Sequence, residues 1–289
     1  MYDTIIIGTG PAGFSAAMNL KIYNKSFLWF GSRAMSDKVS KAEKIRNYPG
    51  LPEITGQDLQ QHFLHHMDTM DIEISEKMVT MIMKNGDSYM VLADNELYEA
   101  QTVLFATGVM TAKTLEGEEE FLGKGISYCA TCDGALYKGK EIAVICNDAR
   151  FEHEVEYLSE LAAHITYFPQ YRDCGFHAAN VTISGERPVS VEGENRAERL
   201  VLKSGQEIPV DGIFIIRNAI APDTLLKELK TEGGHIVVNR NMETNLEGCF
   251  AAGDCTGRPY QYTKAVGEGN VAAHSIIKYL ASKNGGKQV

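Results

Sequence analysis

The sequence predicts an α/β protein made of two doubly wound, Rossmann-like domains, the second inserted into the first. Two observations favour this class. Residues 2–33 alternate strand, glycine turn, helix and strand, and a fresh apolar strand, helix and strand begin near Lys140. We expect residues 1–113 and 241–289 to form the first, discontinuous domain and residues 114–240 to form the inserted one.

The other expected elements continue this alternation. Residues 55–70 are expected to be helical, and the strands around 88–107 end in "TVLFATG". After Gly234, strands in "HIVVN" and "GCFAAGD" precede a last helix from about Tyr262 to Ser282. In the inserted domain we expect a helix at about 151–163 and strands at 141–146, 164–168, 181–184, 189–192, 199–203 and 213–216.

Composition and charge exclude several classes of protein. The 289 residues are 44% hydrophobic and 23% charged, which is ordinary for a globular protein, and the formal net charge of −10 argues against a nucleic-acid partner. The chain enters a strand at once, without a basic and apolar leader, and has no apolar run of the roughly 20 residues that a membrane span needs. We therefore expect a cytoplasmic protein without a membrane partner.

The sequence "GTGPAG" places Gly8, Gly10 and Gly13 between the first strand and the first helix. Gly8 permits a tight turn, Gly10 lets the backbone approach a pyrophosphate, and Gly13 lets the helix pack closely on the strand. The N-terminus of the helix, which includes Pro11 and Ala12, then faces the phosphates. This pattern predicts a dinucleotide-binding site.

The residue expected at the adenosine ribose is missing. An acid should follow about 20 residues after the glycine turn, at the end of the second strand. The sequence there is "LWFGSR", in which Ser32 is the residue that can hydrogen-bond the ribose, and what replaces the acid stays open. A second indication of a nucleotide site is the strand end at Gly253-Asp254, in "CFAAGDCTG".

Cys129 and Cys132 form a CxxC pair that Asp133 follows directly. In a reducing compartment such a pair is catalytic or metal-binding more often than structural. A structural zinc site needs four ligands, and we expect no metal, because the remaining cysteines are singly scattered. These are Cys146, Cys174, Cys249 and Cys255. A CxxC at the start of a helix has a lowered thiol pKa, which favours a redox-active disulfide.

The first turn of the inserted domain lacks the residues that a dinucleotide needs. Cys146, Asn147 and Asp148 stand where glycines would, so that side chains keep the backbone away from a diphosphate. Asp148, with Glu152 and Glu154 in the first helical turns, adds negative charge where a bound anion would lie. The basic cluster that binds a 2′-phosphate is also absent from "YFPQYRDCGF". We expect this domain to persist as a scaffold for the CxxC without binding NADPH.

Five motifs resemble, in order and over essentially the whole chain, the low-molecular-weight thioredoxin reductases. They are "GTGPAG", "NYPG" at 47–50, "ATG" at 106–108, "GEEEFLGKGISYCATCDGALYKGK" and "ETNLEGCFAAGDCTG…YQYTKAVGEGNVAAHSI". The resemblance implies a two-domain FAD/NAD(P)-binding, thioredoxin reductase-like fold and a homodimer. It also implies that FAD is bound by the glycine turn and by Asn47, Ala106, Thr107, Gly108, Gly253, Asp254, Gln261, Tyr262 and Ala265.

The resemblance also implies roles for the redox residues. Cys132 faces the flavin and accepts its electrons, and Cys129 attacks the disulfide of thioredoxin to form a mixed disulfide. Asp133 is the acid/base candidate that protonates the leaving thiolate. Cys255, beside Asp254, is the other cysteine expected near the flavin.

An intact CATC motif without the NADPH motifs resembles the ferredoxin-dependent flavin thioredoxin reductases of anaerobic bacteria. This implies that reduced ferredoxin supplies single electrons to FAD, which passes pairs to the disulfide and on to oxidised thioredoxin. Between Lys21 and Arg46 there are seven basic and two acidic residues, a local net charge of +5. Such a patch suits the docking of a small acidic protein, which would be ferredoxin or flavodoxin.

Three alternatives remain open. The donor can be a reduced deazaflavin, or an atypical NADPH site can still work. The chain can also be a flavin-binding redox sensor or binding module that signals through its CxxC without turnover. A flavoprotein oxidoreductase with a substrate other than thioredoxin is the third.

Overall fold

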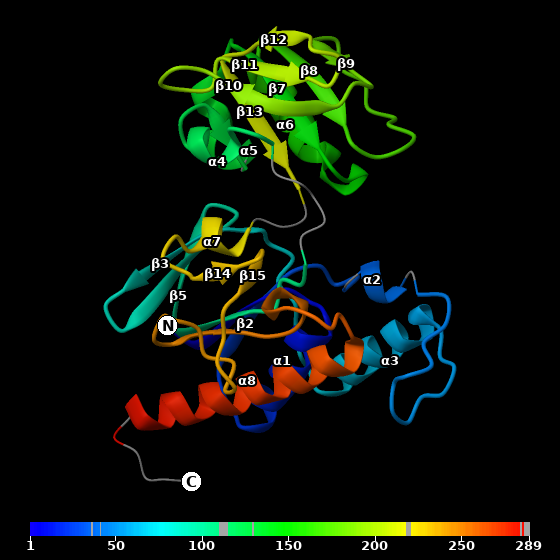
Figure 1. Cartoon of the computed structure of the whole chain (residues 1–289), viewed down its shortest axis with the longest axis vertical. Helices are drawn as coiled ribbons and strands as arrows, with labels where there is room; N and C mark the ends of the chain where they lie inside the picture. The colour runs from blue at the N-terminus through cyan, green and yellow to red at the C-terminus, as the bar shows by residue number, and fades with distance from the viewer. Residues whose placement is uncertain are drawn as a thin grey trace. The chain divides into compact units, whose positions relative to one another are not determined.

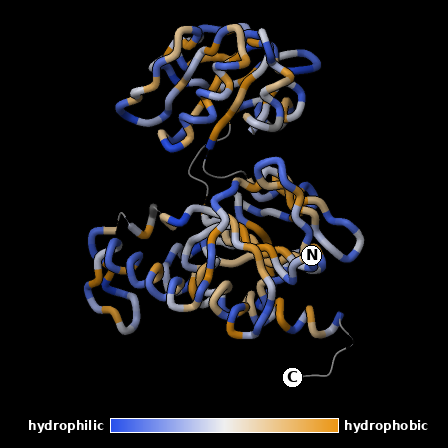
Figure 2. The backbone as a smooth tube through the Cα atoms, turned by 180° about the vertical axis from the view of Figure 1, so that it is seen from behind, coloured by the Kyte–Doolittle hydropathy of each residue, from blue (hydrophilic) through white to orange (hydrophobic). Residues whose placement is uncertain are grey.

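The computed structural model describes residues 1–35, 37–40, 42–109, 115–128, 130–217, 221–283 and 285, without the side chains of residues 37, 38, 119 and 132. The chain forms two compact units. The first comprises Met1–Met110 and Ala221–Val289, and the second comprises Thr111–Ile220. Hydrophobic segments gather inside each unit, as Figure 2 shows. The expected α/β fold class, with one Rossmann-like unit inserted into another, is confirmed.

The first unit is built on a six-stranded mixed sheet with the order β2-β1-β5-β4-β3, in which β16 also pairs with β5. Figure 1 labels β2, β3 and β5 of this sheet, with α1 and α8 in the same unit. Its strands are β1 (Tyr2–Ile7), β2 (Phe27–Phe30), β3 (Val79–Asn85), β4 (Ser88–Ala93), β5 (Glu96–Phe105) and β16 (Cys249–Ala251). Strands β2, β1, β5 and β16 are mutually parallel, whereas β3 and β4 form an antiparallel extension. The carboxyl ends of β1, β5 and β16 therefore meet at one edge, because parallel strands end on the same side.

Two long helices cover one face of this sheet and pack closely against each other. Helices α1 (Pro11–Ile22) and α8 (Tyr262–Lys283) cross where a Cβ on Gly269 would lie 2.2 Å from the Ala12 carbonyl oxygen, so no larger residue fits there. Their core includes Ala16, Ala272 and Ile276. The other elements are α2 (Asp37–Ser40), α3 (Gly56–Thr69), α7 (Pro222–Leu225), the hairpin β14 (Thr231–Glu232) and β15 (His235–Ile236), and the 3-10 turn η3 (Asp254–Thr256).

The second unit contains a five-stranded, fully parallel sheet with the order β6-β13-β7-β8-β9. Its strands are β6 (Ile126–Ser127), β13 (Gly212–Ile216), β7 (Glu141–Cys146), β8 (His164–Pro169) and β9 (Val181–Ile183). A separate antiparallel sheet consists of β10 (Pro188–Glu192), β11 (Arg199–Leu202) and β12 (Glu207–Pro209). The helical elements are α4 (Glu118–Phe121), α5 (Ala130–Asp133), η1 (Gly134–Tyr137), η2 (Ala149–Phe151) and α6 (Glu152–Leu161).

Several elements differ from the sequence expectation. The segment 221–240, expected in the insertion, groups with the first unit, because α7 contacts β3 and β15 contacts η3. The helix expected from about 151 is divided into the turn η2 and α6, which begins at Glu152. Strands β3 and β12 were not expected. Within the described residues, no helix is both long and apolar enough to cross a membrane.

Candidate functional site

The glycine turn of the first unit has the geometry of a diphosphate-binding turn. Gly8 has a φ of +106°, and a Cβ there would lie 2.3 Å from the Ala106 carbonyl oxygen. A Cβ on Gly13 would lie 2.1 Å from the Gly8 carbonyl oxygen, so helix and strand approach as closely as glycine allows. A Cβ on Gly10 would meet nothing within 4 Å, so this backbone segment stays open to a ligand.

The N-terminus of α1 suits an anion. Its N-cap is Gly10, which provides no side-chain cap, and the first turn contains no acidic residue. Amide groups at a helix N-terminus attract negative charge, and here neither a capping oxygen nor a carboxylate of the first turn competes. These residues fit the diphosphate of a bound dinucleotide.

The second strand end expected at the cofactor lies directly beside this turn. The Ala252 amide donates to the Phe105 carbonyl at 2.9 Å, which aligns the end of β16 with the end of β5. A Cβ on Gly253, whose φ is +90°, would lie 2.9 Å from the Ala12 Cβ. The structure thus brings together the glycine turn, the "ATG" segment at 106–108 and Gly253-Asp254.

The start of α8 and the "NYPG" loop also meet. The Asn47 side-chain amide donates to Gln261 Oε1 at 2.6 Å, although 214 residues separate them. Ala265 is buried one turn into α8, and burial raises the pKa of the nearby Tyr262 hydroxyl. Asn47, Gln261, Tyr262 and Ala265 were all expected to bind the cofactor, with Gln261 and Ala265 near the isoalloxazine.

At the end of β2 the structure shows a carboxylate that the sequence did not reveal. The Ser32 hydroxyl oxygen accepts a hydrogen bond from the Ala34 amide at 3.2 Å, within its own turn. The Arg33 amide donates to Glu76 Oε1 at 2.7 Å. Residues 75–76 run alongside β2, because Ser75 and Trp29 share a backbone hydrogen bond of 2.8 Å. An acid therefore lies at the end of β2, although none follows it in sequence.

The redox motif is described only in part. Cys129 and the side chain of Cys132 lie outside the described residues, and the backbone of Cys132 belongs to α5. The Ser127 hydroxyl donates to Asp133 Oδ2 at 2.6 Å, and Ser127 is only 4% exposed. This bond spans the CxxC and fixes the orientation of the Asp133 carboxylate.

A buried ion pair stands beside the redox motif, and sequence reasoning missed it. Glu118 is 0% exposed and its Oε2 accepts from an Arg217 guanidinium nitrogen at 2.8 Å and from the Leu115 amide at 2.8 Å. Its other oxygen accepts from the Tyr128 hydroxyl at 2.6 Å, and the guanidinium lies 5.6 Å from the centre of the Tyr128 ring. Tyr128 directly precedes Cys129, so the pair anchors the chain at the CxxC.

The corresponding turn of the second unit is closed by its own side chains. The Asp148 carboxylate caps the helical segment by accepting from the Arg150 amide at 3.0 Å, and it pairs with the Arg150 guanidinium at 2.7 Å. The Asn147 amide donates to the Ile216 carbonyl at 3.0 Å. Burial raises the pKa of the Cys146 thiol to about 11. The groups that would bind a diphosphate are thus already engaged.

Polar side chains also bridge the start of α6 and the end of β8. The Tyr171 hydroxyl donates to Glu152 Oε1 at 2.5 Å and contacts the Tyr167 hydroxyl at 2.6 Å. The Gln170 amide donates to the Cys146 carbonyl at 2.8 Å, which ties the end of β8 to that of β7. In doubly wound folds a dinucleotide binds at the carboxyl ends of the strands, which is where these side chains lie. The cluster would therefore hinder the binding of a dinucleotide to this unit.

The remaining cysteines near the first-unit site are inert. Cys255 is 3% exposed, and its thiol donates to the Phe105 and Ala252 carbonyls at 3.5 and 3.3 Å. Burial raises its pKa to about 11 and that of Cys249 to about 12, so both thiols stay protonated at neutral pH. Among the described residues, no group of three or more His, Cys, Asp or Glu side chains could hold a metal ion.

The basic stretch 21–46 is partly neutralised by acids from the following segment. Arg33 pairs with Asp68 at 2.9 Å, and Glu53 pairs with Lys44 at 2.9 Å and with Arg46 at 3.5 Å. All these side chains are about half or more exposed, so the pairs are screened by solvent. The net charge of +5 counted along the sequence is therefore larger than the positive charge of this surface once these acids are included.

Known proteins similar to this chain share its whole length. The family model of the pyridine nucleotide-disulphide oxidoreductases matches residues 2–147 and 170–269. The thioredoxin reductases of Helicobacter pylori and Bacillus subtilis are 32% and 30% identical to it, over 97% of this chain and 99% and 95% of theirs.

A crystal structure of a ferredoxin-flavin thioredoxin reductase from Clostridium acetobutylicum superposes with a TM-score of 0.92, at 43% identity and over 98% of each chain. FAD is the cofactor of this family, which confirms the expected cofactor. The chain therefore belongs to the pyridine nucleotide-disulphide oxidoreductases and is a flavoprotein of the thioredoxin reductase type.

Proposed function

We propose that this protein reduces thioredoxin with electrons from reduced ferredoxin, through FAD and the Cys129-Cys132 disulfide, and that NADPH is not its donor. The observation that carries the proposal is the closed turn of the second unit, where Asp148 caps the 3-10 turn η2 that leads into α6, at the place where a nicotinamide dinucleotide would bind. The similarity to a ferredoxin-flavin thioredoxin reductase supports the same donor.

The charge at the second turn makes phosphate binding unfavourable. A diphosphate would have to displace the Asp148 carboxylate from the Arg150 amide and lie close to Glu152, whose own carboxylate accepts from Tyr171. Displacing the Asp148 carboxylate costs about the free energy of the hydrogen bond that it makes as a cap. The negative charges of the diphosphate and of the nearby carboxylates also repel each other. Ferredoxin needs no such turn, because a protein donor transfers electrons without binding inside the fold.

The proposed reaction balances with single-electron donors. Two reduced ferredoxins and two protons convert the disulfide of one thioredoxin into a dithiol. When bound, FAD would accept electrons one at a time and donate them as a pair. We propose that it is bound by Gly8, Gly10, Pro11, Ala12, Gly13, Ser32, Asn47, Ala106, Thr107, Gly108, Gly253, Asp254, Gln261, Tyr262 and Ala265.

The cysteine chemistry then follows thiol–disulfide exchange. The Cys129 thiolate attacks one sulfur of thioredoxin, forms a mixed disulfide and releases the other thioredoxin sulfur, which Asp133 protonates. The Cys132 thiolate next attacks the Cys129 sulfur, which restores the Cys129-Cys132 disulfide and releases the second thioredoxin sulfur as a thiolate that takes up the second proton. Ser127 holds the Asp133 carboxylate for this proton transfer through its 2.6 Å hydrogen bond.

We further propose that the acidic donor docks on the basic stretch 21–46. The support is the charge of this stretch, reduced by its pairs with Glu53 and Asp68. Replacing Lys21 and Lys25 by Glu should raise the KM for ferredoxin several-fold at low salt and leave kcat unchanged, since rim charges act on encounter. Lys278→Glu, an exposed charge reversal on α8, is the matched control. Equal KM values for both variants would contradict this docking surface.

An anaerobic assay with oxidised thioredoxin tests the donor. Photoreduced ferredoxin, NADPH and a reduced deazaflavin are supplied in separate arms, and the thioredoxin thiols formed are counted. We expect catalytic turnover with ferredoxin alone and an unchanged visible flavin spectrum with excess NADPH. Bleaching by NADPH within seconds, or faster turnover with the deazaflavin, would overturn the proposed donor. Reduction of the flavin without any thioredoxin thiols would instead favour a sensor without turnover.

A further inference from the structure

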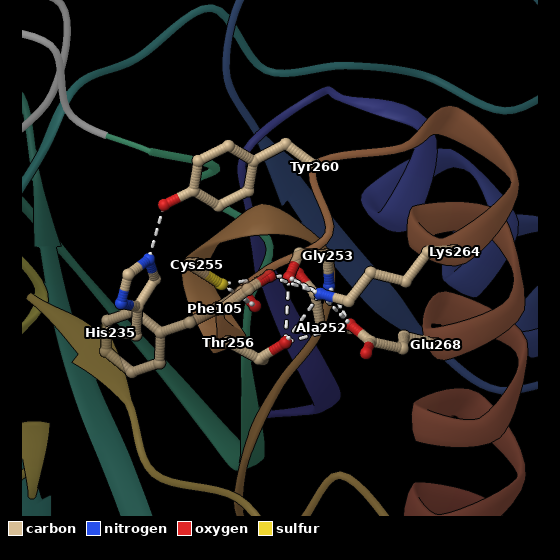
Figure 3. A network of polar contacts seen from close by, with 10 residues as sticks. Phe105, His235, Ala252, Gly253, Cys255, Thr256, Tyr260, Lys264 and Glu268 are labelled. Carbon is tan, nitrogen blue, oxygen red and sulfur yellow. Dashed lines mark hydrogen bonds and ion pairs between the residues drawn. The ribbon is translucent and has the colours of Figure 1, made fainter. Parts of the chain in front are cut away.

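Two charged side chains of α8 hold the loop 253–257 in place (Figure 3). The Lys264 ammonium donates to the Gly253 carbonyl at 2.9 Å, to the Gly257 carbonyl at 2.8 Å and to the Thr256 hydroxyl at 3.1 Å. Glu268 Oε2 accepts from the Gly253 amide at 2.8 Å and from the Thr256 hydroxyl at 2.9 Å. Both backbone groups of Gly253 are therefore bound by one helix.

The two charges also neutralise each other in a partly buried place. The Lys264 ammonium and the Glu268 carboxylate lie 3.1 Å apart, one helical turn from each other, and their side chains are 18% and 19% exposed. A pair this far removed from water is little screened, so loss of either partner leaves a charge that its surroundings do not compensate.

The loop they hold belongs to the flavin-binding site proposed above. Gly253 packs on Ala12, in the first turn of α1, where its Cβ would approach the Ala12 Cβ to 2.9 Å. Its backbone, with a φ of +90°, is a conformation that residues other than glycine rarely adopt. The position of the Asp254 peptide follows from that of Gly253, and both follow from the hydrogen bonds of α8.

We propose that Lys264 and Glu268 are positioning residues for FAD. They fix the Gly253-Asp254 strand end against the glycine turn, and their own opposite charges cancel beside it. This inference rests on the proposed FAD site and not on the proposed donor. It has two separable consequences. Affinity for FAD depends on the hydrogen bonds, whereas the flavin midpoint potential depends on the balance of the two charges.

If the two charges balance each other, the two single variants should shift the flavin midpoint potential in opposite directions. Glu268→Gln leaves the Lys264 cation uncompensated, and a nearby cation favours the more negatively charged reduced flavin, so the midpoint potential should rise. Lys264→Met leaves the Glu268 anion, and the potential should fall. The double variant removes both charges and should restore the potential, while its affinity for FAD stays low because the loop has lost its anchors.

The test uses holoprotein for spectroelectrochemical titration and FAD-stripped protein for binding, followed by the quenching of flavin fluorescence. We expect each single variant to bind FAD about tenfold or more weakly, since a charged group has lost its hydrogen-bonded partner. Lys278→Met, the same charge change at an exposed position of α8, should alter neither quantity.

Binding of FAD by both single variants within twofold of the wild type would overturn the positioning role. Shifts of the potential in the same direction would overturn the charge balance. Thr256→Val, which removes one hydroxyl and no charge, covers the case in which a charged variant fails to fold, and it should weaken FAD binding without moving the potential. Reduction of the wild-type flavin by NADPH would contradict the donor and leave this inference untouched.

Discussion

The molecule contains the same strand–turn–helix arrangement twice, and the two turns differ in the residues that a dinucleotide would meet. At the first turn, the N-cap of α1 is Gly10, which provides no side-chain cap and leaves its surroundings open, and the first turn of the helix contains no acid. At the second, Asp148 caps its own helical segment and pairs with Arg150. Both copies keep their parallel strands, because the apolar pattern that builds a sheet is independent of the turn residues.

The ends of the neighbouring strands differ in the same way. Beside β2, Glu76 accepts a backbone amide and is an exposed carboxylate. Beside β8, the Tyr171 hydroxyl donates a hydrogen bond to the Glu152 carboxylate, so these two groups are engaged with each other. The CxxC also lies in the second unit.

The largest expected effect is the loss of thioredoxin reduction when a cysteine of the CxxC is replaced. Cys132→Ser should abolish the reduction of thioredoxin, since a serine hydroxyl cannot accept an electron pair or form a disulfide. The flavin should still be reduced by ferredoxin, and anaerobic spectra beside the thiol assay would show both. Cys174→Ser, at a half-buried cysteine of the same unit, is the control that should keep its turnover. Thioredoxin turnover in Cys132→Ser would contradict the proposed route.

A substitution at the glycine turn should remove the cofactor. Gly13→Val places a side chain where even a Cβ lies 2.1 Å from the Gly8 carbonyl oxygen, so helix and strand must separate. We expect colourless protein with less than about a tenth of the wild-type FAD, because overpacking at this contact displaces the diphosphate-binding turn. The matched change at the second turn, Phe151→Val, should leave the FAD content unchanged. Equal FAD loss in both variants would show that the two turns do not differ in this role.

Breaking the buried ion pair should destabilise the second unit. Arg217→Met leaves the Glu118 carboxylate, which is 0% exposed, without its cation, and we expect a loss of about 3–5 kcal/mol in unfolding free energy. Denaturant unfolding followed by circular dichroism measures it. The double variant Glu118→Gln/Arg217→Met should recover part of the loss. A double variant less stable than Arg217→Met would contradict the view that the orphaned charge is responsible.

The parts of the site that could be predicted depend on local backbone chemistry. Gly8 and Gly13 are required by a positive φ or a close contact within one turn, and the sequence shows both directly. The second turn was predicted from its residues in the same way, because Cys146, Asn147 and Asp148 stand where glycines would, and the exclusion of NADPH from it stays a prediction.

The parts that could not be predicted depend on partners far along the chain. Glu118 lies in a run of acids that resembles a solvated surface, and its partner Arg217 is 99 residues away. Glu76 reaches the end of β2 from 43 residues downstream. Lys264 and Glu268 have the spacing of an ordinary surface pair, and only the loop 253–257 folded against α8 gives them a role. Long-range pairing of this kind has no signature in a single sequence.

Removing the cap of the second turn should have a modest effect. Asp148→Ala deletes the cap and its pair with Arg150, and we expect a loss of about 0.5–2 kcal/mol in unfolding free energy. NADPH should still fail to bleach the flavin, since Cys146, Glu152 and Tyr171 remain. Thermal unfolding and an anaerobic spectrum with excess NADPH measure the two outcomes. Reduction by NADPH in this variant would mean that a single carboxylate, not the whole closed turn, excludes the nucleotide.

The smallest expected effect concerns Cys146, which stands where the second turn would need a glycine. Burial raises the pKa of its thiol from an ordinary value of 9.0 to about 11, so the folded state binds this proton more tightly than the unfolded state. Its contribution to stability is complete below pH 9 and is lost as the pH rises towards 11. Unfolding measured across this interval should therefore show a steeper decline for the wild type than for Cys146→Ala. Parallel declines would mean that burial does not raise the pKa of the Cys146 thiol in the folded protein.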